Sequence, residues 1–496
     1  MHRQNRRIQA LGAIGASLGL LLSACGDQGG ASESAGSGAS EAPQESASQA
    51  AEAVDIEWYI GLGTGTNPEQ RATQEEQVTA FNADHPNINL TITVVDSEEA
   101  EQDLATRMPT DPPDIIGPVG IRGLQGFGDS LLDLTPFIDS AGVDRGSIED
   151  ALWDVYVLDD KQIGIPMAVY PSFIYYNKTH FDEAGLAYPP HEVGEQYEGE
   201  DWTWDTVRNL ALQLTVDTNG NDATSPDFDE TAIDVWGLDA QFTNNDPRAW
   251  ATIFGGAGSA VADDGTTAQW PDNWREGLQF LYDAMWTDHI FPTRAESDGF
   301  QTGNNNFQTG RIAMEVVHQW YTCCIYPGPA EGEDLAPEAP VTDWDVAVLP
   351  VGPDGNITSK LHADTVGILD TTENPEEAFE VLNWIRTNPD LLQAWGALPA
   401  VADERQAFYD AIAPWTRGTE DTADDAPTLE IDWNVSVQMM EYPDVPSHEA
   451  SMPNFPEANA ANGEFGNLLW TTPGLDLDEE LTTHLERLQG IFDEAQ

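Results

Sequence analysis

Two adjacent cysteines are the side chains in this sequence best suited to covalent chemistry. Cys323 and Cys324 lie in the segment QWYTCCIYP, shortly after Trp320 and Tyr321. Neighbouring thiols can form a vicinal disulfide, stay reduced as small buried apolar groups, or bond to another chain. The choice among these states depends on whether the compartment is oxidising.

The third and last cysteine indicates that compartment. Cys25 ends the run LSAC, which follows three arginines within the first seven residues and an apolar stretch over residues 10–22. This order resembles the lipobox of bacterial lipoproteins, in which the signal peptide, here residues 1–24, is removed and the cysteine is acylated. An ordinary signal peptide with a chance cysteine is the alternative. We therefore expect a protein on the extracytoplasmic face of the cell membrane, held there only by a lipid such as palmitate on Cys25.

An oxidising compartment favours a disulfide between Cys323 and Cys324, although their spacing opposes it. Adjacent Cα atoms lie about 3.8 Å apart, while the Cα atoms of bridged cysteines usually lie about 4.4–6.8 Å apart. Because Cys25 carries the lipid, no third thiol in the chain competes for either of them. We predict that the two cysteines form a strained bridge, and two reduced thiols are the alternative.

A cluster of oxygen-bearing side chains in residues 217–230, DTNGNDATSPDFDE, could hold a hard cation such as calcium. Its spacing departs from an EF-hand, because glycine falls at the fourth position and Phe228 stands where glutamate is needed. An Asx-rich turn is the other interpretation. No cofactor is required by the sequence, and a structural calcium ion is a possibility that it leaves open. The candidate metal ligands are Asp217, Asn219, Asn221 and Asp227.

The sequence contains no complete catalytic motif. Residues 61–66, GLGTGT, approach a dinucleotide fingerprint, but Thr66 stands where its last glycine is needed. The backbone N–H groups of this loop could still hold a polar ligand atom. Walker and H-E-x-x-H motifs are missing, and so is G-x-S-x-G outside the leader. Any two of the 87 acidic residues could form a catalytic pair, so a secreted glycoside hydrolase remains an alternative.

The net charge argues against several partners. The chain has 87 acidic and 19 basic residues, which gives a formal net charge of −68. Such a charge disfavours binding to nucleic acid or to an anionic lipid surface. The acids are dispersed along the chain, which is typical of a solvated surface, and the scarcity of basic residues also disfavours a highly anionic ligand.

The remaining composition divides the chain into a tether and a folded body. Residues 25–54 are rich in Gly, Ser, Ala and Glu, which predicts a flexible segment. The body, residues 55–496, is too long for a single core, so we expect two lobes. Strands and helices alternate at its start, which predicts a parallel sheet. The expected strands are a β-rich run at residues 55–65 that ends in glycines, and residues 88–95, 114–116 and 343–350. The expected helices are residues 68–84, 98–108, 373–389 and 475–493.

Five segments occur in an order that resembles the family 1 extracellular solute-binding proteins of ABC importers. They are residues 163–186, 202–215, 307–320, 344–355 and 374–385. The resemblance covers about residues 55–493 and implies an α/β fold of the periplasmic-binding-protein type, with a ligand cleft between two lobes joined by hinge strands. By this resemblance, residues 55–166 and 343–387 form lobe 1, and residues 167–342 and 388–496 form lobe 2.

The same resemblance implies which residues contact the ligand. Sugars present apolar faces that aromatic rings cover and hydroxyl groups that Asn and Asp bind, and both residue types occur at these positions. For each tryptophan, a place in the core is the alternative. The first-lobe candidates are Gly63, Thr64, Gly120 and Arg122, and the others are Tyr170, Asn244, Asn245, Trp250, Trp320, Tyr321, His362 and Asp364.

The function implied by the resemblance is capture of a mono- or oligosaccharide by cleft closure and its delivery to the transmembrane subunits of an ABC permease. We expect a monomer that catalyses no reaction, binds no nucleic acid, and needs no cofactor for this task. The alternatives are the glycoside hydrolase and a binding protein for another solute, such as a polyol, glycerol phosphate or a peptide.

Overall fold

The computed structural model describes the chain from residue 53 to residue 495 with several gaps. The described residues are 53–158, 160–241, 246–300, 305–325, 341, 343–412, 415–416, 428–429, 431–445, 447–448 and 452–495. The chain divides into the units Met1–Ala51 and Glu52–Gln496, and the description concerns the second. Within these ranges, no helix is long and apolar enough to cross a membrane.

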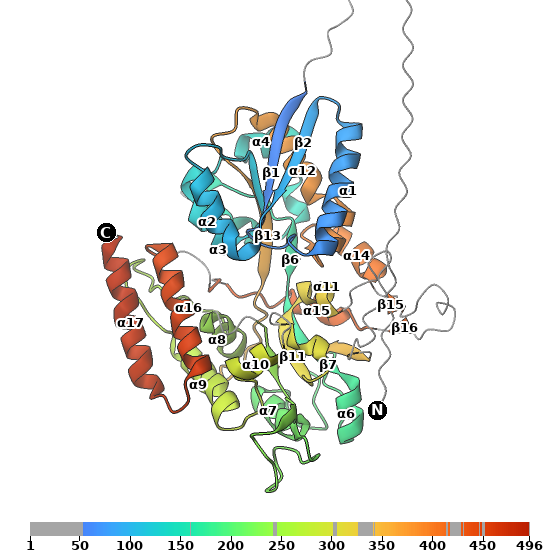
Figure 1. The fold of residues 1–496 in the computed structure, drawn as a ribbon, viewed down its shortest axis with the longest axis vertical. Helices are drawn as coiled ribbons and strands as arrows, with labels where there is room; N and C mark the ends of the chain where they lie inside the picture. The colour runs from blue at the N-terminus through green and yellow to red at the C-terminus, as the bar shows by residue number, and fades with distance from the viewer. Residues whose placement is uncertain are drawn as a thin grey trace, which may run out of the picture. The chain divides into compact units, whose positions relative to one another are not determined.

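The first lobe is built on a six-stranded sheet in the order β14-β6-β13-β3-β1-β2. Strand β1 (Val54–Ile60) pairs in parallel with β2 (Ile88–Val94) and with β3 (Ile115–Gly120). The crossovers are α1 (Pro68–Asp84) and α2 (Ser97–Arg107). This arrangement confirms the predicted parallel sheet. Figure 1 shows β1, β2, α1 and α2 in shades of blue in the upper lobe.

Three further strands complete this sheet in antiparallel fashion. Strand β13 (His362–Ile368) pairs with β3 and with β6 (Ala168–Tyr170), and β6 pairs with β14 (Leu398–Pro399). The helices that accompany this sheet are α3 (Ile121–Phe127), α4 (Thr135–Ala141), α5 (Asp150–Asp154), α12 (Pro375–Arg386), α13 (Pro389–Ala394) and α14 (Arg405–Ile412).

The second lobe contains a four-stranded sheet in the order β10-β11-β7-β12. Strand β11 (Met314–His318) pairs in parallel with β10 (Asp239–Ala240) and antiparallel to β7 (Ser172–Asn177), which also pairs with β12 (Trp344–Ala347). The helices of this lobe are α6 (Lys178–Ala184), α7 (Trp204–Leu214), α8 (Pro247–Gly255), α9 (Asp272–Trp286), α10 (Arg294–Phe300), α11 (Thr322–Ile325), α15 (Asn434–Met439), α16 (Phe455–Thr471) and α17 (Leu477–Glu494).

The sheet pairing corrects the expected lobe boundaries. Strand β12 was expected to start the return to lobe 1 at residue 343, but it pairs with β7 in the second sheet, and β13 makes the return. The chain also stays in the first lobe beyond residue 387, since Trp395 donates to the Oε1 of Gln74 on α1 (2.9 Å) and β14 pairs with β6. A buried strand has the same apolar pattern in either sheet, which explains the error.

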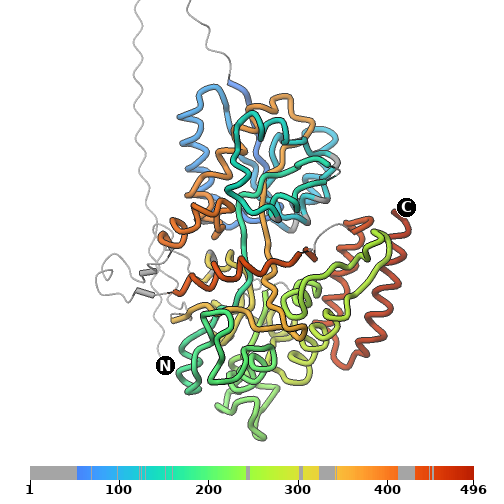
Figure 2. Tube along the Cα trace, turned by 180° about the vertical axis from the view of Figure 1, so that it is seen from behind, coloured from blue at the N-terminus to red at the C-terminus, as the bar shows by residue number. Residues whose placement is uncertain are grey.

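The two lobes are joined by crossing segments. The chain passes from β6 to β7 at Pro171, so the expected change of lobe at residue 167 falls four residues too early. It returns through Ser359 and Lys360 into β13, which lies beside β6. Figures 1 and 2 show β6 and β13 side by side where they run between the sheets. This pair of crossings matches the hinge strands implied by the family resemblance.

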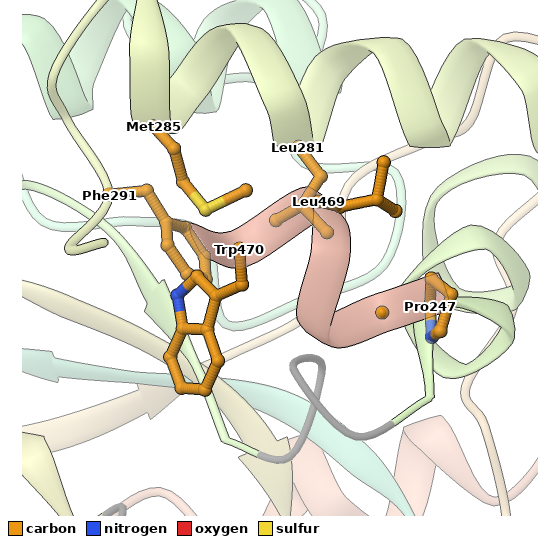
Figure 3. Close-up of a pocket in the computed structure, with 7 residues that line it drawn as sticks. Pro247, Leu281, Met285, Phe291, Leu469 and Trp470 are labelled. Atoms are coloured by element: carbon orange, nitrogen blue, oxygen red, sulfur yellow. The ribbon is translucent and has the colours of Figure 1, made fainter. Parts of the chain in front are cut away.

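The core of the second lobe is tightly packed around α8, α9 and α16. The void there measures about 10 Å³ and is lined by Pro247, Leu281, Met285, Phe291, Gly466, Leu469 and Trp470. Figure 3 shows Met285 and Phe291 beside the ring of Trp470, with Leu281, Leu469 and Pro247 farther from it. The void has room for about one water molecule and none for a sugar, so it is a packing defect and not a binding site.

Candidate ligand-binding site

Ring side chains gather where the crossing segments meet the end of β11. Trp320, in the single turn η4 (Gln319–Tyr321) after β11, is half-buried. Its ring centroid lies 5.4 Å from that of Tyr170 on β6 and 4.8 Å from that of His362 on β13. His318, at the end of β11, lies 4.2 Å from Trp320 and 4.4 Å from His362. Both lobes therefore supply rings to one cluster.

The first lobe brings polar groups to the same place. Asp364 accepts a hydrogen bond from the Tyr170 hydroxyl (3.2 Å) and lies opposite Gly120 in the register of β13 and β3. A side chain at Gly63 would meet the Pro118 carbonyl at 2.8 Å, so glycine lets the loop after β1 approach β3 closely. Gln70 donates to Thr64 Oγ1 (3.0 Å) and holds that loop.

These contacts show which predicted residues the structure brings together. Tyr170, Trp320, His362 and Asp364 are direct neighbours, and Gly120 lies beside them. Tyr170 is 1% exposed, because it packs against the Trp320 ring and the Asp364 carboxylate. Tyr170 is thus placed to orient these two groups, whereas Trp320 and His362 keep part of their surface open.

The orientation of Trp320 is fixed by a hydrogen-bond chain. Its Nε1 donates to Gln241 Oε1 (3.0 Å), and Gln241 Nε2 donates to Asn305 Oδ1 (2.7 Å). From the first lobe, Gly396 at φ +64° approaches so closely that a Cβ there would lie 3.0 Å from the Trp320 carbonyl. An aromatic ring held in one orientation is well suited to cover the apolar face of a ligand.

Ser172 connects this cluster to the crossing segments. Its backbone N–H donates to Ser359 Oγ (2.9 Å), and its hydroxyl donates to the Lys360 carbonyl (2.7 Å). The hydroxyl proton is thus used, so Ser172 Oγ accepts from His318 Nδ1 (2.6 Å). This bond assigns the His318 proton to Nδ1. Burial, followed by the electrostatic effect of the nearby His362 and Lys360, holds the pKa of His318 well below its usual value, so the ring is neutral.

A buried ion pair lies near the cluster, since it contacts His448, whose ring centroid lies 6.3 Å from that of His362. Asp246 is the N-cap of α8 and accepts from the Arg248 backbone N–H (3.0 Å). The Arg248 side chain, 0% exposed, donates its Nε and Nη2 to both carboxylate oxygens and its Nη1 to the His448 carbonyl (3.3 Å). Burial works to raise the pKa of Asp246, but the charge and hydrogen bonds of Arg248 outweigh it and lower that pKa.

Besides Tyr170, two of the predicted contact residues are buried in the core. Trp250 is 0% exposed, packs against Trp204 (5.1 Å) and Phe280 (5.7 Å), and donates to the Gly277 carbonyl. The ring lies on the buried face of α8, so the expectation that it covers a sugar is corrected. The alternative interpretation, in which this tryptophan is part of the core, is correct for Trp250.

Tyr321 is also corrected to a core residue. It is 0% exposed and its ring lies 5.6 Å from the Tyr175 ring on β7. The tight turn η4 directs neighbouring side chains to different sides of the backbone, so Trp320 stays half-buried while Tyr321 enters the second-lobe core.

Other predicted positions lie outside what the structure describes. These are Cys25, Asn244, Asn245 and the side chains of Arg122, Cys323 and Cys324. The backbone of the two adjacent cysteines forms part of α11. Their bridge stays a prediction, which the intact mass before and after reduction would test.

The candidate calcium loop is organised around one carboxylate. Asp217 Oδ1 accepts from the backbone N–H groups of Asn219 (2.8 Å) and Asn221 (2.9 Å), and Oδ2 accepts from the Asn221 amide (3.0 Å) and from Asp229 N–H (3.0 Å). These bonds form the Asx-rich turn that was the other interpretation of the segment. Across the described part of the chain, no group of three or more His, Cys, Asp or Glu side chains could hold a metal ion. Calcium binding at this loop, with Asp227 as a further ligand, stays a prediction. It would require the ion to displace the N–H groups that now donate to the Asp217 carboxylate.

Sequence reasoning missed several residues of the cluster. His318, Gln241, Lys360 and His448 are absent from the predicted set, yet the first two contact Trp320 directly. His448 Nδ1 contacts Asp444 Oδ2 (3.2 Å). Their positions depend on how distant segments pair, and no local pattern in the sequence marks them.

Comparison with known proteins now identifies the family. Residues 64–390, more than half of the chain, match the bacterial extracellular solute-binding proteins. The chain belongs to this family. A binding protein of Brucella abortus (strain 2308) is 24% identical over 340 residues, which cover 68% of this chain and 74% of that protein.

Solved structures of similar proteins confirm the two-lobed α/β fold. The ABC substrate-binding protein of Listeria monocytogenes in complex with cycloalternan has a TM-score of 0.67 and 19% identity over 88% of this chain and 99% of its own. A solute-binding protein of an ABC transporter from Thermotoga lettingae, bound with α-D-tagatose, has a TM-score of 0.64 and 17% identity over 89% of this chain and 100% of its own. Both confirm the expected fold class.

Proposed function

We propose that this solute-binding protein captures a mono- or oligosaccharide between its two lobes and delivers it to the permease of an ABC importer. The observation that carries the proposal is the half-buried ring of Trp320 at the lobe junction, beside Tyr170 and Asp364. The similar proteins from Listeria and Thermotoga, which hold cycloalternan and α-D-tagatose, support a carbohydrate as the class of ligand.

The chemistry of the cluster suits a sugar. The Trp320 ring can cover the apolar face of a pyranose, while the Asp364 carboxylate and the His362 imidazole can bind hydroxyl groups. A site that combines one fixed ring with a few polar groups orients its ligand through both. Rotation of the lobes about Pro171 and Ser359 would close the site, and the closed form would be the one that the permease recognises.

The ligand passes through this site unchanged. The family consists of solute-binding proteins, and the proposed contacts need no bond to be broken. Incubation of the purified protein with a panel of glycosides would leave the panel intact, whereas turnover that one carboxylate substitution abolishes would support the glycoside hydrolase instead.

A thermal-shift screen tests the class of ligand. A ligand that binds only the folded protein, at about 100 times its dissociation constant, stabilises it by about 2.7 kcal/mol. We expect one or more mono- or oligosaccharides to raise the melting temperature by a few degrees, with no response to amino acids or peptides. A response confined to a polyol, to glycerol phosphate or to peptides would contradict the proposal.

We also propose that the protein acts as a monomer tethered to the membrane through lipid on Cys25. The LSAC run after the apolar stretch supports this proposal. Replacing Cys25 with serine is expected to move the protein from the membrane fraction to the soluble fraction, because the acyl chains are then lost. Retention of the Cys25→Ser variant in membranes with an intact acyl label would refute the anchor.

A further inference from the structure

A carboxylic acid is enclosed in the centre of the second-lobe sheet. Glu315 on β11 is 0% exposed, and neither of its side-chain oxygens has a hydrogen-bond partner among the described residues. An isolated charged carboxylate in such a place is very costly, and a buried acid avoids this cost by keeping its proton. The position itself therefore favours neutral Glu315.

The nearest partner in the sheet is a second acid. In the register of the parallel strands β10 and β11, Asp239 lies directly opposite Glu315, and Tyr175 on β7 lies opposite it on the other side. Asp239 is 3% exposed and accepts from Asn306 Nδ2 (2.7 Å) and Ala240 N–H (2.8 Å). Tyr321 packs edge-on against the Tyr175 ring (5.6 Å), so among the described residues these contacts place two carboxyls and two phenols together.

The pKa values of both acids are raised, which favours their neutral forms. Burial, followed by the charge of Asp239, holds the pKa of Glu315 well above its ordinary value of 4.5, against the opposing effect of the Gln241 backbone N–H, whose approach does not have hydrogen-bond geometry. Burial raises the pKa of Asp239 to about 6, against the hydrogen bond from Asn306. Because two adjacent buried carboxylates repel each other, the pair takes up its second negative charge only at high pH.

Hydrogen bonds through Asn305 and Asn306 link this acid pair to the ligand cluster. Asn306 binds Asp239, and its neighbour Asn305 accepts from Gln241, which in turn accepts from Trp320 Nε1. On the other side, the Tyr175 hydroxyl donates to the carbonyls of His318 (3.3 Å) and Gln319 (3.4 Å). The two strand neighbours of Glu315 thus hold both sides of the segment that carries Trp320.

We propose that Glu315 is a proton-dependent positioning residue, whose neutral form keeps β10, β11 and the Trp320 segment packed and whose ionisation loosens them. The inference rests on the proposed function in one respect, that Trp320 contacts the carbohydrate. For a group whose pKa is raised in the folded state, the stabilisation is complete below the unfolded pKa and is lost as pH rises through the folded pKa. Ligand affinity and stability should both decline toward high pH.

The test uses three variants of the full chain, measured from pH 5 to pH 8.5. Glu315→Gln keeps the shape of the side chain without its charge, and Glu315→Met serves if the buried amide prevents folding. Glu101→Gln, at an exposed position on α2, is the matched control. We expect both Glu315 variants to flatten the pH dependence of the urea midpoint without ligand, and Glu101→Gln to retain the wild-type profile.

The second readout is the affinity for the saccharide found by thermal shift. We expect wild-type affinity to fall by about tenfold from pH 5 to pH 8.5, which corresponds to about one unit of difference in pKa between the free and the liganded protein. The Glu315 variants should show a smaller fall, since only Asp239 still titrates in them. The proposal would be overturned if both Glu315 variants kept the wild-type pH dependence of the urea midpoint. It would also be overturned if that pH dependence became weaker in the variants while the ratio of their affinities at pH 5 and pH 8.5 stayed at the wild-type value. Because the unfolding measurement needs no ligand, a failure of the proposed function itself would appear separately, as no binding at any pH.

Discussion

Replacing Trp320 with alanine is expected to weaken carbohydrate binding by about 30-fold or more, since central aromatic anchors commonly contribute at least 2 kcal/mol to binding. The ring is half-buried at the lobe junction and held by its bond to Gln241 (3.0 Å), so it is ready to cover the face of a sugar before the ligand arrives. Isothermal titration with the saccharide identified by thermal shift measures the effect. Trp320→Phe should keep much of the affinity because it keeps a ring.

The matched control for this variant is Trp384→Ala. Trp384, like Trp320, is a partly buried ring packed against the core, but it lies on α12 of the first lobe against Trp58 (6.5 Å). We expect its loss to lower stability and leave affinity unchanged. An affinity of Trp320→Ala within about twofold of wild type, a difference below about 0.5 kcal/mol, would contradict the placement of the ligand on this ring.

Replacing Arg248 with methionine is expected to lower the free energy of unfolding by about 3–5 kcal/mol. The substitution leaves the buried carboxylate of Asp246 without the guanidinium that now binds both of its oxygens. It also removes the donor to the His448 carbonyl. Urea denaturation followed by circular dichroism measures the change.

An exposed ion pair in the same lobe provides the control. The side chains of Arg487 and Glu464 are 46% and 65% exposed, and Arg487→Met should cost no more than about 1 kcal/mol. Because the pKa of Asp246 is lowered in the folded state, its contribution is present above the unfolded pKa and is lost as pH falls through the folded pKa. The difference in free energy of unfolding between wild type and Arg248→Met should therefore become smaller at acid pH. Equal losses of unfolding free energy in Arg248→Met and Arg487→Met would refute the role of the buried pair.

Local signals in the sequence were sufficient for much of the first lobe. The helix expected at residues 68–84 is α1 (Pro68–Asp84), because proline favours the first turn and the HP pair that follows ends the helix. The alternating run that starts at Ile88 is β2 (Ile88–Val94). In both cases the pattern depends only on residues close in the sequence.

Pairing between distant strands was not predictable in the same way. Strand β12 (Trp344–Ala347) was recognised as a buried strand but assigned to the wrong lobe, since its apolar pattern suits either sheet. The choice of partner is made by tertiary packing, which a single sequence does not reveal.

In the candidate site, too, some residues were predicted correctly and others were not. The family resemblance led to Trp320, Tyr170 and Asp364, which the fold brings together. It also led to Trp250, whose helix α8 turns that ring into the core, where it stacks with Phe280. Residue type and position in the sequence do not determine whether a tryptophan is buried, because burial depends on the helices that pack around it.

The most direct test of the account is a crystal structure of the protein with the saccharide that stabilises it most. We expect one sugar ring to lie flat against Trp320, with a hydroxyl group within hydrogen-bond distance of Asp364 or His362 and with both lobes in contact with the ligand. A saccharide bound elsewhere on the protein, away from the junction of β6, β13 and β11, would contradict it.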